Sequence, residues 1–377
     1  MQKSVLIRSL LLISLTLTAL TSVNAQTFNL IRPGVEYAEF IKETKDGPLR
    51  GHLLRLDLTK VRLDVVHARD MVVGVETTSA MAKRYGALAA INTGFFKIGV
   101  GALSGVPVGV LRIDGVDYTD SYGGRSTVFI TNNRDATAVS IERINKETFL
   151  VLNGKKLKAG FNKIREKDDV VVYTDLYNRT TLTNSDGTEF IVNRGRITEA
   201  RYGKGSSVIP SGGFVISVSG KKRAEMESFL KMGSQASFSR STTPVTGSLK
   251  DEVLKAEDAV AGVPQIVRDG KVSVTVIEEK SSKEFSETRH PRTALAILRD
   301  GHVLLAVFDG RQPGHSVGVS LDEMAEILVG LGADVAVNFD GGGSTAMYLD
   351  GKVVNKPSDK EGERPVSDAI LVNLRDK

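Results

Sequence analysis

Short stretches in which hydrophobic and polar residues alternate are typical of β-strands, and several occur along this chain. They lie at 53–66 (LLRLDLTKVRLDVV), 128–131, 169–173 and 294–308 (ALAILRDGHVLLAVF). The stretches 78–85 and 321–331 instead have the spacing of a one-sided helix. Ser320 and Glu323 form a capping-box pattern at the start of the second helix. The pattern therefore predicts many short strands and two clear helices.

The same order of elements occurs twice. At 53–92 and again at 294–338, two strands precede a helix and a third strand that ends in Asn. The final strands read GALAAIN (86–92) and GADVAVN (332–338), and a Val-Gly-Val precedes each helix. We interpret these segments as duplicated β-β-α-β units; a chance likeness is the alternative. The predicted fold is α+β, with a central mixed sheet that is flanked by helices and brings the two Asn-ended strands close together.

The residues between the two units, about 126–260, are rich in predicted strands and turns. Asn153-Gly154 between LVL (150–152) and KKLKAG (155–160) is a good hairpin signal. We therefore predict one domain over 26–377. Its core units lie at about 50–125 and 260–377, and a β-rich section is inserted between them.

Residues 1–25 have the pattern of a secretory signal. Lys3 and Arg8 precede a short apolar core at 10–20, and the small residues of 23–25 offer a cleavage site before Gln26. The apolar run is too short and too rich in Thr and Ser for a good membrane span, although an uncleaved anchor is the alternative. We expect an exported protein, periplasmic or secreted, with no stable membrane span after cleavage.

Composition excludes several functions. The chain has no Cys, which rules out disulfides, Cys-ligated zinc and thiol nucleophiles. Its net charge of +5 is spread out, and without a long basic run we expect no nucleic-acid partner. The absence of Trp favours a small site for a charged ligand over a long glycan groove. The oligomeric state stays open.

A glycine-rich loop follows the second Asn-ended strand. Backbone N–H groups in such a loop make an anion-binding concavity, and hydroxyl groups add donors. No Gly-Lys-[Ser/Thr] is present, so ATP is not implied. A plain tight turn is the alternative. The candidate residues are Asn338, Asp340, Gly342, Gly343, Ser344 and Thr345.

Arginines and a second aspartate stand at loops beside the same predicted sheet. Arg292 and Thr293 begin one strand, Asp309 ends the next, and Arg364 precedes the last. Arginines suit phosphate recognition, and carboxylates suit proton transfer. The oxygens of Asp309, Asp340 and Asn338 would also suit Ca²⁺ or Mg²⁺. We predict no metal and no cofactor, because the arginines already supply positive charge.

The stretch 292–372 closely resembles the phosphodiester glycosidase family. The motifs are RTALAILRDGH, VFDGRQPGHSVGVSLDEM, NFDGGGSTAMYLDGK and ERPVSDAILV; NTGFF (92–96), GVPVGVLRIDG (105–115) and AGVPQIVRDG (261–270) extend the likeness. Thr93 stands where the family usually has Gly, and His315 where Tyr is common. The resemblance implies hydrolysis of a glycosyl–O–phosphate bond, which releases a sugar and leaves a phosphomonoester.

The resemblance also implies roles for the candidate residues. Asp340 is the first choice for the catalytic carboxylate and Asp309 the second. Arg292 and Arg364 would hold the phosphate. Asn92 and Asn338 would bind sugar hydroxyls or orient Asp340. The remaining predicted substrate-binding residues are Thr293, Gly342, Gly343, Ser344 and Thr345. A metal-dependent phosphodiesterase and a binding module for phosphorylated glycans without catalysis are the competing functions.

Overall fold

The computed structural model describes residues 26–120 and 122–375, and the predicted secretory signal at 1–25 lies outside them. Strands are the dominant secondary structure of the described chain and are arranged in three sheets. Within this part of the chain, no helix combines the length and the apolar character that a membrane crossing requires.

The first sheet has eight strands, and helix α5 (Leu321–Gly330) packs on one of its faces. Leu321, Met324 and Leu328 of α5 are fully buried against it, as the helical spacing predicts. In sheet order the strands are β1 (Asn29–Arg32), β2 (Val35–Thr44), β3 (Gly47–Leu56), β20 (Val303–Phe308), β19 (Arg292–Leu298), β21 (Ala333–Asn338), β17 (Gln265–Arg268) and β18 (Lys271–Val272).

The second sheet has five strands and carries helix α1 (Thr78–Arg84). Its C-terminal strand β24 lies between β5 and β4, so the last element of the chain holds two early strands together. The sheet order is β23 (Lys352–Val353), β22 (Met347–Leu349), β5 (Ala89–Asn92), β24 (Asp368–Leu374) and β4 (Val61–His67).

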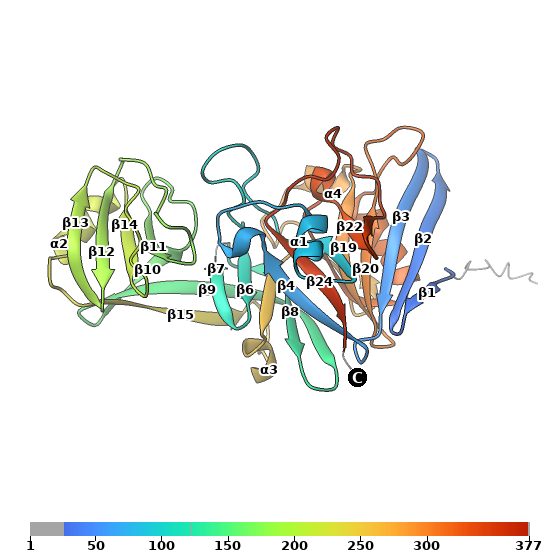
Figure 1. The fold of residues 1–377 in the computed structure, drawn as a ribbon, viewed down its shortest axis with the longest axis horizontal. Coiled ribbons are helices and arrows are strands. Elements are labelled where there is room, and N and C mark those ends of the chain that lie inside the picture. The colour runs from blue at the N-terminus through green and yellow to red at the C-terminus, as the bar shows by residue number, and fades with distance from the viewer. Residues whose placement is uncertain (1–25, 121, 376–377) are drawn as a thin grey trace, which may run out of the picture.

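The third sheet has eleven strands and includes most of the segment expected as an insertion. Figure 1 shows β10 to β14 and helix α2 (Lys222–Phe229) at one end of the molecule, with β9 and β15 running from there toward the other sheets. Its strands are β13 (Arg196–Tyr202), β12 (Thr188–Asn193), β14 (Phe214–Val218), β11 (Val170–Thr174), β10 (Lys155–Phe161), β9 (Thr137–Leu152), β8 (Arg125–Asn132), β16 (Asp258–Ala261), β6 (Val110–Ile113) and β7 (Val116–Asp120), with β15 (Ala236–Pro244) on β9.

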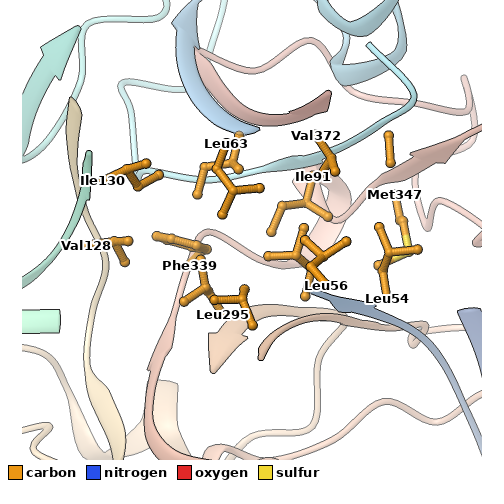
Figure 2. Close-up of a cluster of buried hydrophobic side chains, with 14 of the residues drawn as sticks. Leu54, Leu56, Leu63, Ile91, Val128, Ile130, Leu295, Phe339, Met347 and Val372 are labelled. Carbon is orange, nitrogen blue, oxygen red and sulfur yellow. The ribbon is translucent and has the colours of Figure 1, made fainter. Parts of the chain in front are cut away.

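The main core lies where the three sheets meet (Figure 2). Leu295 comes from the first sheet, Ile91 from the second and Val128 from the third, and all three are fully buried. Phe339, just after β21, fills the space between them. This packing fixes the backbone immediately before Asp340.

Four short helical segments lie outside this core. They are α3 (Asp251–Leu254), α4 (Lys283–Glu287) and the 3₁₀ turns η1 (Ala68–Asp70) and η2 (Gly342–Ser344). Helix α4 precedes β19, and η2 follows β21 and is itself part of the predicted anion-binding loop.

Several local predictions are confirmed. Both predicted helices form, and Ser320 and Glu323 make the reciprocal capping-box bonds. Asn153 and Gly154 have φ of 47° and 81° and join β9 to β10 as an antiparallel hairpin. The larger arrangement differs from a single central sheet, because β5 and β21 belong to different sheets. The run 53–66 is also divided: β3 joins the first sheet and β4 the second. Alternation reveals which face is buried but not which strand becomes the partner. The duplication of the two units stays a prediction.

Candidate functional site

The glycine-rich loop lies between the first and second sheets. It follows β21, where the Asp340 N–H donates to Thr93 O at 2.8 Å, next to the end of β5. On the other side, the Gly342 N–H donates to Pro291 O at 2.8 Å, just before β19. These bonds hold the loop at the ends of strands from both sheets.

Asn92 fastens this loop through all its side-chain polar atoms. Its Nδ2 donates to Asp340 O at 2.7 Å, and its Oδ1 accepts from Thr293 Oγ1 at 2.8 Å and from Ala346 N at 3.1 Å. Thr293 Oγ1 also lies 3.4 Å from Thr345 Oγ1, and Asn92, Thr293 and Thr345 are all buried. Of the two predicted roles for Asn92, this geometry favours orienting Asp340 over binding a sugar.

Asp340 is the carboxyl group with unused bonding capacity. Its Oδ1 accepts from Gly341 N at 3.0 Å. Its Oδ2 and Ser344 Oγ are buried, and neither makes a hydrogen bond of ordinary geometry with a described residue. Burial raises the pKa of the Asp340 carboxyl to about 6, although the nearby Ser344 hydroxyl, the Gly341 N–H and Arg364 act in the opposite direction. A buried carboxyl with a raised pKa and a free oxygen is a candidate for proton transfer or nucleophilic attack.

A second carboxylate, Asp368, supports the same region and was missed in the sequence. It accepts from Thr93 Oγ1 at 2.5 Å, from Gly94 N at 2.6 Å and from Ser367 Oγ at 2.5 Å. Its charge also raises the pKa of Asp340, after the larger effect of burial. Its position before the last strand, in the motif ERPVSDAILV, was the available signal.

Two arginines lie over the glycines. A Cβ on Gly342 would stand 3.0 Å from Arg311 Nη1, and one on Gly343 would overlap the side chains of Arg364 and Asp359. Arg364 donates to both carboxylate oxygens of Asp359, at 2.7 and 3.1 Å, so part of its charge is already compensated. The glycines therefore allow guanidinium groups to approach the backbone closely, which larger residues would prevent.

Arg311 and His290 form the exposed side of the site. Arg311 is exposed, and its Nε lies 3.2 Å from His290 Nδ1. Burial and then the charges of Arg311 and Arg292 lower the pKa of His290. His290 therefore accepts a hydrogen bond from Arg311 as a neutral imidazole, and the positive charge of Arg311 stays available to an anion.

Arg292 points into the protein more than the sequence indicated. Its Nε donates to Val319 O at 3.3 Å, and its Nη2 donates to Phe285 O at 2.6 Å and to Thr288 O at 2.9 Å. Burial, with a further effect of Arg311, lowers the pKa of Arg292 to about 10. Among the described residues Arg292 has no carboxylate partner, so its buried positive charge is not compensated. Its Nη1 is the nitrogen that remains able to donate to an anion.

The predicted cradle of backbone amides is smaller than expected. The N–H of Gly342 is used by Pro291 O and the N–H of Ser344 by Gly341 O, whereas the N–H of Gly343 has no partner among the described residues. Asn338 turns its Nδ2 to Val263 O at 2.6 Å, and its buried Oδ1 is left without a partner in the described chain.

Asp309 belongs to a different set of contacts. It is buried at the end of β20, and its Oδ2 accepts from His315 Nε2 at 2.8 Å. Its Oδ1 accepts from Asn355 Nδ2 at 3.2 Å and from Lys356 N at 3.0 Å. Burial alone would raise the pKa of Asp309, but the facing His52 and His315 hold it below its usual value. Asp309 is therefore an ionised partner of histidines rather than a neighbour on the glycine-rich loop.

The arrangement of carboxylate and imidazole side chains decides whether the described chain has a ready-made metal site. Within 26–120 and 122–375, no three His, Cys, Asp or Glu side chains are grouped as a set of metal ligands.

Comparison with known proteins defines the class. The family model for phosphodiester glycosidases matches residues 186–373. The N-acetylglucosamine-1-phosphodiester alpha-N-acetylglucosaminidase of Bos taurus is 30% identical over 189 residues, which are 44% of this chain and 35% of the bovine protein. The chain thus spans about a third of that relative's length.

Two solved structures share the fold. A hypothetical protein from Synechocystis has a TM-score of 0.77 and 21% identity, covering 91% of this chain and 62% of the other. A protein from Burkholderia pseudomallei, named as a candidate exported protein, has a TM-score of 0.74 and 23% identity, covering 86% of this chain and 74% of the other. The protein is thus a mostly β protein of several sheets. Its residues 186–373 carry the domain of the phosphodiester glycosidase family.

Proposed function

We propose that this protein is an exported hydrolase that cleaves the glycosyl–O–phosphate bond of a sugar phosphodiester. The proposal rests most on Asp340, whose buried Oδ2 has no partner and lies on the loop beneath Arg311. The family and the name of the bovine relative support the same bond. The signal pattern at 1–25 and the Burkholderia relative support export.

In the proposed reaction, the phosphate group lies against Arg311, the Gly343 N–H and the Ser344 hydroxyl. Arg292 adds positive charge from behind. These groups stabilise the negative charge that collects on the phosphate oxygens as the bond from the sugar carbon breaks. Because phosphate is a good leaving group, little general-acid assistance is needed.

Asp340 acts on the sugar carbon in its ionised form, either directly or by activating water. In the overall reaction, the C1–O bond breaks and the oxygen of water joins C1. Of the two protons of that water, one remains on the sugar hydroxyl and one is released or taken up by the phosphomonoester. Asn92 and the packed Phe339 keep the Asp340 backbone in place.

The test is hydrolysis in ¹⁸O-labelled water of the methyl phosphodiester of N-acetylglucosamine 1-phosphate, by purified residues 26–377. The proposal predicts free sugar that carries the label and unlabelled methyl phosphate. Methanol and a sugar 1-phosphate that carries the label in its phosphate group would instead show a phosphodiesterase, and loss of that activity in EDTA would make it metal-dependent. Binding without turnover would indicate a binding module.

Two variants test the assigned roles. Asp340→Asn is expected to lower kcat by at least about a thousandfold, because it removes the reacting charge and keeps the shape. Arg311→Met is expected to raise KM about tenfold or more, because one charge-assisted contact to phosphate is lost. Normal turnover by the Asp340→Asn variant would contradict the assignment of the catalytic carboxylate.

A further inference from the structure

A second polar hollow, here called the Asp309 pocket, lies beside the ends of β3 and β20. It has a volume of about 240 Å³ and lies outside the glycine-rich loop. Its size suits a single small ring or a short polyol and is below that of common drug-sized sites. Its charged lining residues are Glu39, Arg50, Asp309 and Lys356, and its other polar lining residues are His52, His315 and Asn355.

A chain of hydrogen bonds indicates which ring nitrogen is protonated in the two histidines of the Asp309 pocket. The ionised Asp309 faces His52 Nε2, with Oδ2 at 3.8 Å, which favours the ring proton of a neutral His52 on Nε2. His52 Nδ1 then accepts from the Tyr37 hydroxyl at 2.7 Å, and burial, which raises the pKa of Tyr37 to about 12, keeps that hydroxyl protonated. The ionised Asp309 accepts from His315 Nε2 at 2.8 Å. In neutral His315, Nδ1 is therefore left as an acceptor.

The pocket thus offers both kinds of hydrogen-bonding group. His315 Nδ1 accepts, and His52 Nε2 donates. Arg50 Nε is buried without a partner among the described residues and is a further donor. The positive charges of Arg50 and Lys356 balance the negative charges of Glu39 and Asp309 around the pocket. A neutral group with several hydroxyls, each able to donate and accept, fits this set better than a second anion would.

The Asp309 pocket lies next to the glycine-rich loop that forms the proposed phosphate site. Asn355 Nδ2 donates to Asp309 Oδ1 at 3.2 Å and to Thr345 O at 3.1 Å, and Thr345 directly follows Ser344. The turn at 311–315 also contributes a residue to each site, because Arg311 lies over Gly342 and His315 contacts Asp309. Two parts of one extended ligand can therefore bind on the two sides of this turn.

We propose that the Asp309 pocket binds the hydroxyl-bearing group at one end of the phosphodiester, with His315 as the residue that determines specificity. This inference rests on the proposed function. The shared chemistry is a neutral polyol, supplied either by the sugar or by the alcohol on the other side of the phosphate.

Kinetics of two substrates distinguish these sources. The glycerol and methyl phosphodiesters of one sugar 1-phosphate are compared for the protein and for His315→Phe. If the pocket takes the alcohol, KM of the glycerol ester rises about tenfold while KM of the methyl ester and both kcat values stay within twofold. If it takes the sugar, KM of both esters rises together.

Matched variants separate recognition from general damage. His315→Gln keeps a hydrogen-bonding side chain and is expected to recover most of the lost affinity. His302→Phe changes a partly exposed histidine at the other end of β20 and is expected to leave both KM values unchanged. Unchanged KM values for both esters in His315→Phe would overturn the proposal.

A binding measurement does not depend on turnover. Saturation-transfer NMR with glycerol and with N-acetylglucosamine is expected to detect one of them on the protein and on Asp340→Asn, but not on His315→Phe. Absence of transfer from both probes to the unchanged protein, or equal transfer to His315→Phe, overturns the pocket assignment. Failure of hydrolysis with intact, His315-dependent binding would instead refute only the proposed function.

Discussion

Asn92 Nδ2 donates to the main-chain oxygen of Asp340 at 2.7 Å, although the two residues are 248 positions apart in the chain. This bond joins the end of β5 in the five-stranded sheet to the loop after β21 in the eight-stranded sheet. The position of the candidate catalytic carboxyl therefore depends on how two sheets dock.

Replacing Asn92 by Asp tests this connection. The change keeps the shape but replaces the Nδ2 donor by an acceptor that faces the Asp340 carbonyl, so the buried bond to Asp340 O is lost. We expect a loss of about 2–4 kcal/mol in the free energy of unfolding and a lower kcat, as measured by urea unfolding and by sugar release. Asn133→Asp, on an exposed turn, is the control and should change neither.

The pKa of Asp340 predicts how activity depends on pH. Since the proposed base or nucleophile must be ionised and burial raises its pKa to about 6, kcat/KM should fall as pH drops through 6. Between pH 8 and pH 5 we expect a decrease of about tenfold. An increase of kcat/KM over the same interval would show that Asp340 works in its protonated form, as a general acid.

The same carboxyl should lower stability at high pH. A raised pKa in the folded state means that the stability of the protein is greatest below the unfolded-state pKa and is lost as pH rises through about 6. Asp340→Asn should therefore raise the free energy of unfolding at pH 8 by up to about 3 kcal/mol, and the gain should vanish near pH 4. Asp359→Asn, which breaks the pair with Arg364, should give no such gain.

Gly343 tests the close approach of the arginine pair. A Cβ there would overlap both Arg364 and Asp359, so Gly343→Ala must displace them from the loop. We expect kcat/KM to fall by about tenfold or more while circular dichroism shows a folded protein. Gly330→Ala, at the end of α5 with open space around the glycine, is the matched control. Equal activity of the two variants would show that the Arg364–Asp359 ion pair has no part in the site.

The sequence predicted local features more fully than it predicted the arrangement of the sheets. Periodicity and caps identified α1 and α5 because those signals are local. The assignment of β3 and β4 to different sheets depends on long-range pairing with β20 and β24, which alternation does not encode. The motif around Asp340 was visible because its glycines and polar residues are consecutive.

The direction in which a side chain points also could not be predicted from the sequence. Arg292 and Asp309 were both identified, but their neighbours were not. Whether an arginine at a strand start faces a cleft or the carbonyls of Phe285 and Thr288 depends on the face to which it points. Likewise, the histidines that surround Asp309 come from β3 and from a later turn, at sequence separations that no local pattern reveals.

The central place of β24 has a consequence for biosynthesis. Asp368, at its start, ties down Thr93 and Gly94, and the strand itself joins β5 to β4. While residues 368–374 are still inside the ribosome, the nascent chain lacks the strand that pairs with β4 and β5 and so positions Asn92 next to Asp340. The arrangement around Asp340 would thus be completed only after residues 368–374 have left the ribosome and paired with β4 and β5, and a nascent chain without them would hold neither Thr93 nor Gly94 in place.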